Sequence, residues 1–424
     1  MQQFSLSANI EEGQNKDFNY IVTPNAQDVA SGIVNGYNSG IHSFTIIGSY
    51  GTGKSCFLLA LEKDLQSKGQ HNLINPQTLS SCKKYEVLKI VGDYKDLASL
   101  MRNKLAIDGT ADNVLDELRN RYSQAKKRGS FLIIFIDEFG KVLEHAAKND
   151  PEQELYFMQK LAEFVNVPTR QMLLITTLHQ NFSAYARKLS TVQKEEWNKV
   201  KGRFKELVFI EPVEQLLYLA SKQNGSCKDL GDNAPGLTKL CELAKDTKFV
   251  SDGFTPETAK ALYPLEPFSA YAITQAIQRY GQNERSLFSF LNTKGANSLC
   301  EYEDGFYGLA NCYDYILHNF YSYLKDANAD SMQWSSMQVA LERVEGQSWE
   351  TKNELLGAIK IVKTIGLLNL LGNSSFKMTR EQTANYAKVA LGVEDALHIL
   401  NLLEQYKIIS VSYTPLRAHE TGRN

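Results

Sequence analysis

Eight consecutive residues near the N-terminus have the types and spacing of a phosphate-binding loop. Positions 48 to 55 read Gly-Ser-Tyr-Gly-Thr-Gly-Lys-Ser, which fits the template Gly-x-x-x-x-Gly-Lys-Ser/Thr at every fixed position. Glycine has no Cβ, so the backbone can wrap closely around phosphate oxygens, and the N-terminus of a following helix attracts anions. We therefore predict a phosphate site built from Gly48, Ser49, Tyr50, Gly51, Thr52, Gly53, Lys54, Ser55 and Cys56.

Two side chains at the end of this loop would carry the chemistry. Lys54 would reach the β- and γ-phosphates of a nucleotide, and Ser55 would place its hydroxyl on Mg²⁺. The apolar run 44–47 before the loop is typical of a buried strand, and a helical pattern begins at Cys56. This context distinguishes the motif from a chance glycine-rich turn, and it predicts ATP and Mg²⁺ as cofactors.

A pair of carboxylates follows a second apolar run. Residues 131–136 are all apolar, which suits a parallel strand that is covered on both faces. Ligands gather at the carboxyl ends of such strands. We therefore predict that Asp137 holds Mg²⁺ through water and that Glu138 is the general base that activates the attacking water. The alternative is a solvated strand end at which Asp137 only caps a helix.

Composition narrows the class of protein. The 424 residues suffice for two or three domains, and 43% of them are apolar. The net charge of −2 argues against a broadly basic nucleic-acid-binding surface. Six cysteines without a C-x-x-C pair favour reduced thiols and a cytoplasmic location. No run approaches 18 apolar residues, so we expect no membrane span.

The elements that must position these residues alternate along the chain. Thr23 and Pro24 are typical of a helix start, and a helix is expected to about Asn38. Strands are predicted at 43–47, 85–91, 131–137, 172–177 and 207–211. Helices are predicted at 94–105, 112–127 and 153–166. This alternation predicts an α/β fold with a doubly wound parallel sheet, followed by an all-α region.

The ordered motifs resemble those of AAA+ ATPases, closest to the initiator-like or origin-recognition-like clade and its bacterial relatives. The resemblance covers roughly 20–293 and implies a P-loop NTPase domain with a helical lid. It also implies that a polar residue at the end of strand 172–177 aligns the attacking water. Thr177 is favoured for this role, and Thr176 stays open.

The same resemblance implies roles for two arginines. Arg203, within Gly-Arg-Phe at 202–204, would act on the ATP of a neighbouring subunit, which implies a homo-oligomer; a surface arginine beside a strand is the alternative. Arg285, in the lid segment 283–290, would contact the γ-phosphate. Further segments resemble ATPases of bacterial defence islands, namely 137–141, 155–163 and 263–267.

The sequence of the C-terminal third indicates a function less clearly. The aromatic residues of 302–323 suit either base stacking or packing, and packing is expected. Three helices near 353–371, 379 onward and 393–405, with a strand from Ile408, suggest a winged helix. Its third helix carries acidic residues and no Lys or Arg, which favours a packing or protein-contact module over DNA reading. The stretch from Ser412 resembles a translated sequencing adapter.

These observations predict a modular ATPase that hydrolyses ATP with Mg²⁺ in an oligomer and acts on protein partners, with nucleic acid weakly supported. Two other functions stay open: a slowly hydrolysing nucleotide-gated switch or scaffold, and a DNA-loading initiator. The expected modules are an N-terminal tail 1–19, a nucleotide-binding domain 20–212, a lid 213–293, a helical linker 294–350, a winged-helix-like domain 351–411 and an artefactual tail 412–424.

Overall fold

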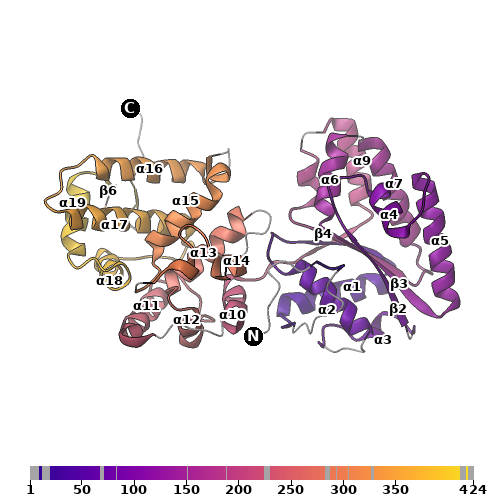
Figure 1. Cartoon of the computed structure of the whole chain (residues 1–424), viewed down its shortest axis with the longest axis horizontal. Coiled ribbons are helices and arrows are strands. Elements are labelled where there is room, and N and C mark those ends of the chain that lie inside the picture. Colours follow the sequence, from indigo (N-terminus) through magenta and orange to yellow (C-terminus); the bar gives the residue numbers. More distant parts are fainter. Residues whose placement is uncertain are drawn as a thin grey trace. The chain divides into compact units, whose positions relative to one another are not determined.

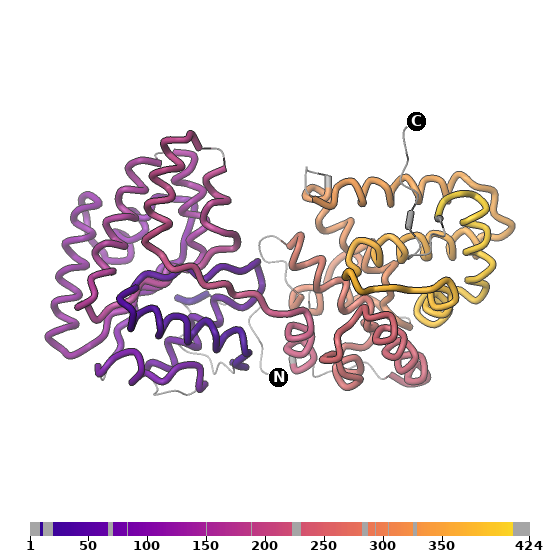
Figure 2. The backbone as a smooth tube through the Cα atoms, turned by 180° about the vertical axis from the view of Figure 1, so that it is seen from behind, coloured from indigo at the N-terminus to yellow at the C-terminus, as the bar shows by residue number. Residues whose placement is uncertain are grey.

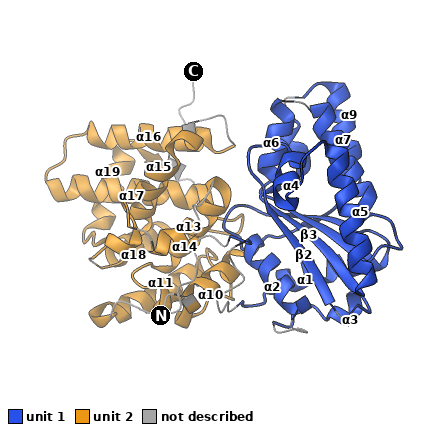
Figure 3. Ribbon diagram, turned by 45° about the vertical axis from the view of Figure 1, so that its right-hand side comes forward, with its two compact units in different colours: residues 1–211 blue, residues 212–424 orange. Residues whose placement is uncertain are grey.

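The computed structural model divides the chain into two compact units, residues 1–211 and 212–424 (Figure 3). We describe each unit by itself. The described residues are 9–11, 20–66, 71–82, 84–149, 151–187, 189–223, 230–281, 287–292, 294–303, 305–325, 329–410 and 417–418.

A five-stranded parallel sheet organises unit 1. The strands are β1 (Ser43–Ile47), β2 (Lys84–Val91), β3 (Ser130–Asp137), β4 (Met172–Leu178) and β5 (Lys205–Val208). Their order in space is β2-β3-β4-β1-β5. Every residue of β3 and β4 is buried, as expected of inner parallel strands covered on both faces. The carboxyl ends of β1, β3 and β4 therefore meet at one edge of the sheet.

Helices cover both faces of this sheet (Figures 1 and 2). One face packs on α1 (Pro24–Asn38), α2 (Lys54–Gln66) and α3 (Pro76–Leu79), through a core that includes Phe131, Ile133 and Phe135. The intervening side chains Leu132, Ile134 and Ile136 face the opposite core, since successive side chains of a strand alternate. That second core belongs to α4 (Leu97–Leu105), α5 (Ala111–Lys127), α6 (Phe139–Lys148), α7 (Pro151–Val165), α8 (Phe182–Tyr185) and α9 (Thr191–Lys201).

The predicted α/β class with a doubly wound parallel sheet is confirmed, and one strand needs correction. The strand predicted at 207–211 is β5, which begins at Lys205 and ends at Val208. Its extent is set by its partner, because Phe44–Ile47 of β1 pair with residues 205–208. The apolar run continues to Ile210, but the chain leaves the ladder there and Glu211 turns inward to accept a 2.5 Å hydrogen bond from Thr23 Oγ1.

Unit 2 is helical, with one continuous core. Its helices are α10 (Val213–Gln223), α11 (Ala234–Asp246), α12 (Pro256–Leu262), α13 (Pro267–Tyr280), α14 (Leu287–Asn292), α15 (Leu309–Lys325), α16 (Ser331–Glu345), α17 (Lys352–Leu371), α18 (Arg380–Leu391) and α19 (Ala396–Gln405). The core spans the expected lid, linker and winged-helix segments alike. A short antiparallel pair, β6 (Ile409–Ser410) with β7 (Arg417–Ala418), follows α19.

Two details of unit 2 match local sequence signals. The helix suggested from 379 onward is α18, and Thr379 and Gln382 form a capping box at its start. The aromatic residues of 302–323 mostly serve packing, since Phe306, Tyr307, Tyr313, Tyr315 and Phe320 are buried. Among the described residues, no helix combines the length and apolar character needed to cross a bilayer.

Candidate nucleotide site

The loop between β1 and α2 has a backbone that only glycine allows at three positions. Gly51 and Gly53 have φ values of 73° and 94°, which side-chain-bearing residues rarely adopt. Gly48 is required for a different reason, because a Cβ there would lie 2.1 Å from the carbonyl oxygen of Phe209. The Gly48 N–H donates to Leu178 O at 3.0 Å, which ties the start of the loop to the end of β4.

Lys54 folds over this loop. Its Nζ donates to the carbonyl oxygens of Gly48 at 2.5 Å and Ser49 at 2.7 Å. Burial lowers the Lys54 pKa to about 8, against the opposing effect of the carboxylates of Asp137 and Glu138. The ammonium is therefore still charged at pH 7. Burial also raises the pKa of the adjacent Cys56 to about 11, with a further contribution from Asp137, so the thiol stays protonated.

Asp137 and Glu138 lie at the end of β3 and are held by Thr177 from β4. Thr177 Oγ1 donates to Asp137 Oδ1 at 2.5 Å and accepts from the Glu138 N–H at 2.9 Å, so its single hydroxyl proton and a lone pair are both used. Asp137 is only 4% exposed. Glu138 has φ 53° and ψ 34°, a left-handed conformation that costs free energy in a residue with a Cβ and is typical of functional sites.

Gly92, which follows β2, supports this strained turn from the other side. Its N–H donates to Asp137 O at 2.7 Å. A Cβ on Gly92 would lie 2.4 Å from Glu138 O, so the backbone after β3 can approach β2 only because this residue is glycine. Three parallel strands thus fix the two carboxylates beside the loop.

The two threonines left open by the sequence have different surroundings. Thr176 is fully buried, with its Oγ1 3.0 Å from Thr45 Oγ1 and 3.3 Å from Phe44 O. Thr177 contacts Asp137 and the Glu138 backbone, as described above. Because alternate residues face opposite sides of a strand, only Thr177 lies on the side of the carboxylates.

The Glu138 carboxylate is engaged by a cation that sequence reasoning did not single out for a role. Lys141, in the first turn of α6, lies with its Nζ 2.5 Å from Glu138 Oε2, and both side chains are close to half exposed. The hydrogen bond to Glu138 raises the Lys141 pKa. The i, i+3 spacing on a helix start was the available signal for this pair.

A metal ion at this site would rely on few protein ligands. Among the described residues, no cluster of three or more His, Cys, Asp and Glu side chains could hold a metal ion. Mg²⁺ nevertheless fits the oxygen donors at hand, since it keeps several waters and binds through one or two protein oxygens plus phosphates. The Ser55 hydroxyl and the buried Asp137 carboxylate are such donors.

Of the two predicted arginines, only Arg203 lies within the described residues. Arg203 lies just before β5, and its Nη2 donates to Glu163 Oε1 of α7 at 2.6 Å, with both side chains 37% exposed. Arg285 lies outside the described residues. Neither observation tests the roles assigned to these arginines, which stay predictions.

Histidine 179 was missed by sequence reasoning. It follows β4 directly and stacks on Tyr50 of the loop, with ring centroids 4.7 Å apart and an interplanar angle of 22°. Its Nδ1 is 3.0 Å from the hydroxyl of Tyr185 on α8. A lone histidine two residues after Thr177, at a strand end expected to face ligand, was the only signal for it.

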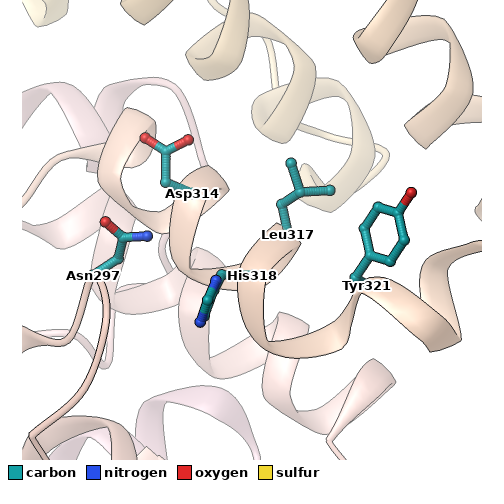
Figure 4. Close-up of a pocket in the computed structure, with 5 residues that line it drawn as sticks. All are labelled: Asn297, Asp314, Leu317, His318 and Tyr321. Atoms are coloured by element: carbon teal, nitrogen blue, oxygen red, sulfur yellow. The ribbon is translucent and has the colours of Figure 1, made fainter.

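A pocket of about 420 Å³ occurs in unit 2 and contains none of the predicted site residues. It is lined by Asn297, Asp314, Leu317, His318 and Tyr321 (Figure 4). Asp314 is paired with Lys363 Nζ at 2.5 Å. The residues predicted to bind phosphate and metal lie outside this pocket, at the loop and strand ends of unit 1.

Neither a protein-family model nor a curated protein sequence matches the chain. Solved structures with a similar fold include the ORC2 protein of Aeropyrum pernix in ADPNP–ADP complexes, at 11% identity and TM-score 0.37 over 98% of this chain and 93% of that one. Drosophila ORC bound to DNA is 12% identical, with TM-score 0.32 over 96% and 88%. A Walker-type ATPase of Pyrococcus abyssi is 11% identical, with TM-score 0.31 over 94% and 93%.

Proposed function

We propose that the chain is a Mg²⁺-dependent ATP hydrolase of the AAA+ type. One observation carries the proposal: the glycine loop with Lys54 and the Asp137–Glu138 pair lie at the same edge of one parallel sheet, close enough for both carboxylates to influence the Lys54 pKa. A phosphate-binding loop without acidic partners would support binding alone. A buried aspartate beside it supports metal placement, and a half-exposed glutamate supports proton abstraction.

Each residue has a distinct part in this proposal. The loop N–H groups and Lys54 bind the β- and γ-phosphates, for which the ammonium exchanges its two carbonyl partners for phosphate oxygens. Ser55 and Asp137 would hold Mg²⁺, which would neutralise the developing charge on the phosphate oxygens. Thr177 fixes Asp137 and the Glu138 backbone. Glu138 takes the proton of the attacking water.

Binding is tested by titrating Mg·ATP into Lys54→Ala by calorimetry. Loss of the loop ammonium should abolish measurable affinity, because a charge-assisted bond to the phosphates disappears. Lys63→Ala, in the last turn of the same helix, is the matched control and should bind like the parent. Equal affinity of Lys54→Ala and the parent would remove the site assignment.

A slowly hydrolysing nucleotide switch is the second candidate, and the Glu138–Lys141 ion pair favours it. While the carboxylate is held by Lys141, it is not free to accept a proton from water. The switch and the ATPase differ in the rate at which the assembled oligomer hydrolyses ATP. A switch retains bound ATP for many minutes even as an oligomer, whereas an ATPase releases phosphate continuously.

We also propose that the active form is a homo-oligomer in which Arg203 acts on a neighbour's ATP. This extends the resemblance to AAA+ proteins, and it requires Arg203 to leave Glu163, an exposed partner whose pairing is worth only about 0–1 kcal/mol. The motif resemblance further supports bacterial genome defence as the setting, which a deletion strain challenged with phage would test: unchanged phage sensitivity would argue against it.

A DNA-loading role finds little support in the C-terminal module. Helix α19 buries Ala396, Ile399, Leu400 and Leu403 and contains no Lys or Arg. Glu404 of this helix is paired with Arg380, and Glu394, just before the helix, is paired with Lys388. Such a helix offers phosphates no cation of its own, so protein contact is the function we propose for this module.

A further inference from the structure

Three ring side chains from three separate elements meet at the phosphate loop. Tyr50 belongs to the loop itself, His179 follows β4, and Tyr185 lies on α8. His179 is stacked on Tyr50 at 4.7 Å and 22° and meets the ring of Tyr185 edge-on at 5.3 Å and 81°. Tyr185 is only 7% exposed. The imidazole is thus held on two sides by aromatic rings, and one of these rings is part of the loop.

The charge state of this imidazole follows from what surrounds it. Burial, with the nearby ammonium of Lys54, lowers the His179 pKa to about 4, so the ring is neutral near pH 7. Burial also raises the pKa of the Tyr185 hydroxyl, which therefore keeps its proton. The other facing group is Glu144 on α6, whose Oε1 lies 3.9 Å from His179 Nε2.

The Tyr185 hydroxyl anchors the imidazole through a hydrogen bond. It lies 3.0 Å from Nδ1 and 3.4 Å from Nε2 of His179. A neutral imidazole has one N–H donor and one acceptor nitrogen, so Nδ1 as the acceptor leaves the ring proton on Nε2, on the side of the Glu144 carboxylate. The contact with Tyr185 limits rotation of the ring that supports Tyr50.

The same ring also contacts the helix that begins after the proposed base. A Cβ on Gly140 would lie 2.3 Å from the Tyr185 hydroxyl oxygen and 3.0 Å from His179 Nδ1. Gly140 is the second residue of α6. The absence of a side chain there is what allows the pair to sit against the start of α6, so the loop, the end of β4 and α6 share one packed junction.

We propose that His179 is a positioning residue for nucleotide binding: its ring, oriented by Tyr185, supports Tyr50 and so holds the phosphate loop in the shape that binds phosphates. The proposal rests on the nucleotide site proposed above. His179 itself touches no reacting group in this account. Its removal should loosen the loop and weaken ground-state binding of ATP, while the proposed base and its supports stay in place.

A double-mutant cycle tests this directly. The dissociation constant of Mg·ATP and kcat are measured for the parent, His179→Ala, Tyr50→Ala and the double variant. An aromatic pair of this kind supports a coupling of about twofold to tenfold in affinity. We expect both single variants to bind ATP more weakly and the double variant to bind no more weakly than the worse single. For His179→Ala, kcat at saturating ATP should stay within about twofold.

Two further variants keep the test decisive. His179→Phe retains a flat ring and should recover most of the affinity. His179→Leu removes the flat ring but retains apolar volume, and it replaces His179→Ala if that variant does not fold. An affinity for His179→Leu equal to that for His179→Phe would overturn the proposal, because a ring would then be unnecessary.

A second histidine–tyrosine pair in unit 1 provides the matched control. Tyr37 and His42 lie with ring centroids 4.4 Å apart at 34°, and burial lowers the His42 pKa as well. His42 directly precedes β1, whereas the loop follows β1, so about 17 Å of strand separates His42 from the phosphate loop. A double-mutant cycle on Tyr37 and His42 should show that the two residues are coupled in their effect on the melting temperature and are not coupled in their effect on ATP affinity.

The outcomes separate the two proposals. Additive effects of His179→Ala and Tyr50→Ala on affinity, or coupling confined to the melting temperature, would overturn the positioning role. If Lys54→Ala abolishes ATP binding in the same experiments, the nucleotide site itself survives that result. Unchanged binding by Lys54→Ala would instead remove the nucleotide site.

Discussion

A buried carboxyl in unit 2 makes the stability of that unit depend on pH in an unusual direction. Glu266 is fully buried before α13. Its oxygens accept hydrogen bonds from Phe268 N at 2.7 Å, from Ser269 N at 2.8 Å and from the Tyr386 hydroxyl at 2.9 Å. The Tyr386 hydroxyl in turn accepts from Leu309 N at 2.9 Å. The network joins three segments of the unit.

Burial outweighs these hydrogen bonds and raises the Glu266 pKa from 4.5 to about 7. A carboxyl with a raised pKa in the folded state binds its proton more tightly than in the unfolded chain, so it favours folding fully below pH 4.5. That contribution is lost as the pH rises towards 7. A difference of about 2.5 pKa units corresponds to about 3 kcal/mol.

Glu266→Gln removes this proton equilibrium and keeps an acceptor oxygen. We therefore expect the free energy of unfolding of the variant, relative to the parent, to rise by about 3 kcal/mol between pH 4.5 and pH 8. Urea titrations at several pH values, followed by the fluorescence of Trp334 and Trp349 in unit 2, measure this difference. Glu242→Gln, at an exposed position on α11, is the control. A constant difference between parent and Glu266→Gln across this range would refute the reasoning.

Three further predictions follow from ion pairs in unit 1. Lys89→Met should destabilise the protein by about 3–5 kcal/mol, because it leaves the Glu62 carboxylate buried without its cation; the two side chains of this pair are 6% and 5% exposed. Adding Glu62→Met should restore most of the lost stability, as measured by urea unfolding. Lys141→Gln should raise kcat by up to about fivefold, since it releases the proposed base from an exposed pair worth about 0–1 kcal/mol; a lower kcat would contradict this. Arg203→Ala should bind ATP normally and hydrolyse it slowly, and mixing it with Lys54→Ala protomers should recover partial turnover; mixed oligomers without recovery would argue that Arg203 is structural.

The fold could be predicted from the sequence where the local pattern of apolar residues agrees with their burial. The inner strand beginning near Phe131 stands out because it is a continuous apolar run in a sheet buried on both faces, and the strand at 43–47 stands out because it is mainly apolar and ends at the glycine loop. The edge strand β5 was misplaced by two residues at its start. Its apolar run extends past the ladder, and only pairing with β1 decides where the strand ends.

The candidate site was readable only in part, for a similar reason. Loop glycines and the acidic pair have fixed local spacing, so they were found by type and position. The choice between Thr176 and Thr177 depends on which of the two side chains lies on the same face of the sheet as Asp137, and the contact of His179 with Tyr50 joins residues 129 positions apart. These two contacts are set by tertiary structure, and no local pattern encodes them. The direction of the Glu138 side chain depends on Lys141, for which the i, i+3 spacing was a local signal.

The central claim is that Glu138 serves as the base for ATP hydrolysis at this loop. The most direct measurement is phosphate release in a single turnover, with excess enzyme and Mg·ATP, by the parent and by Glu138→Gln. The amide keeps the size of the side chain and cannot take the proton, so the account predicts an unchanged ATP affinity and a chemical step slower by about 10²–10⁴. Equal rates of phosphate release by the two proteins would contradict it.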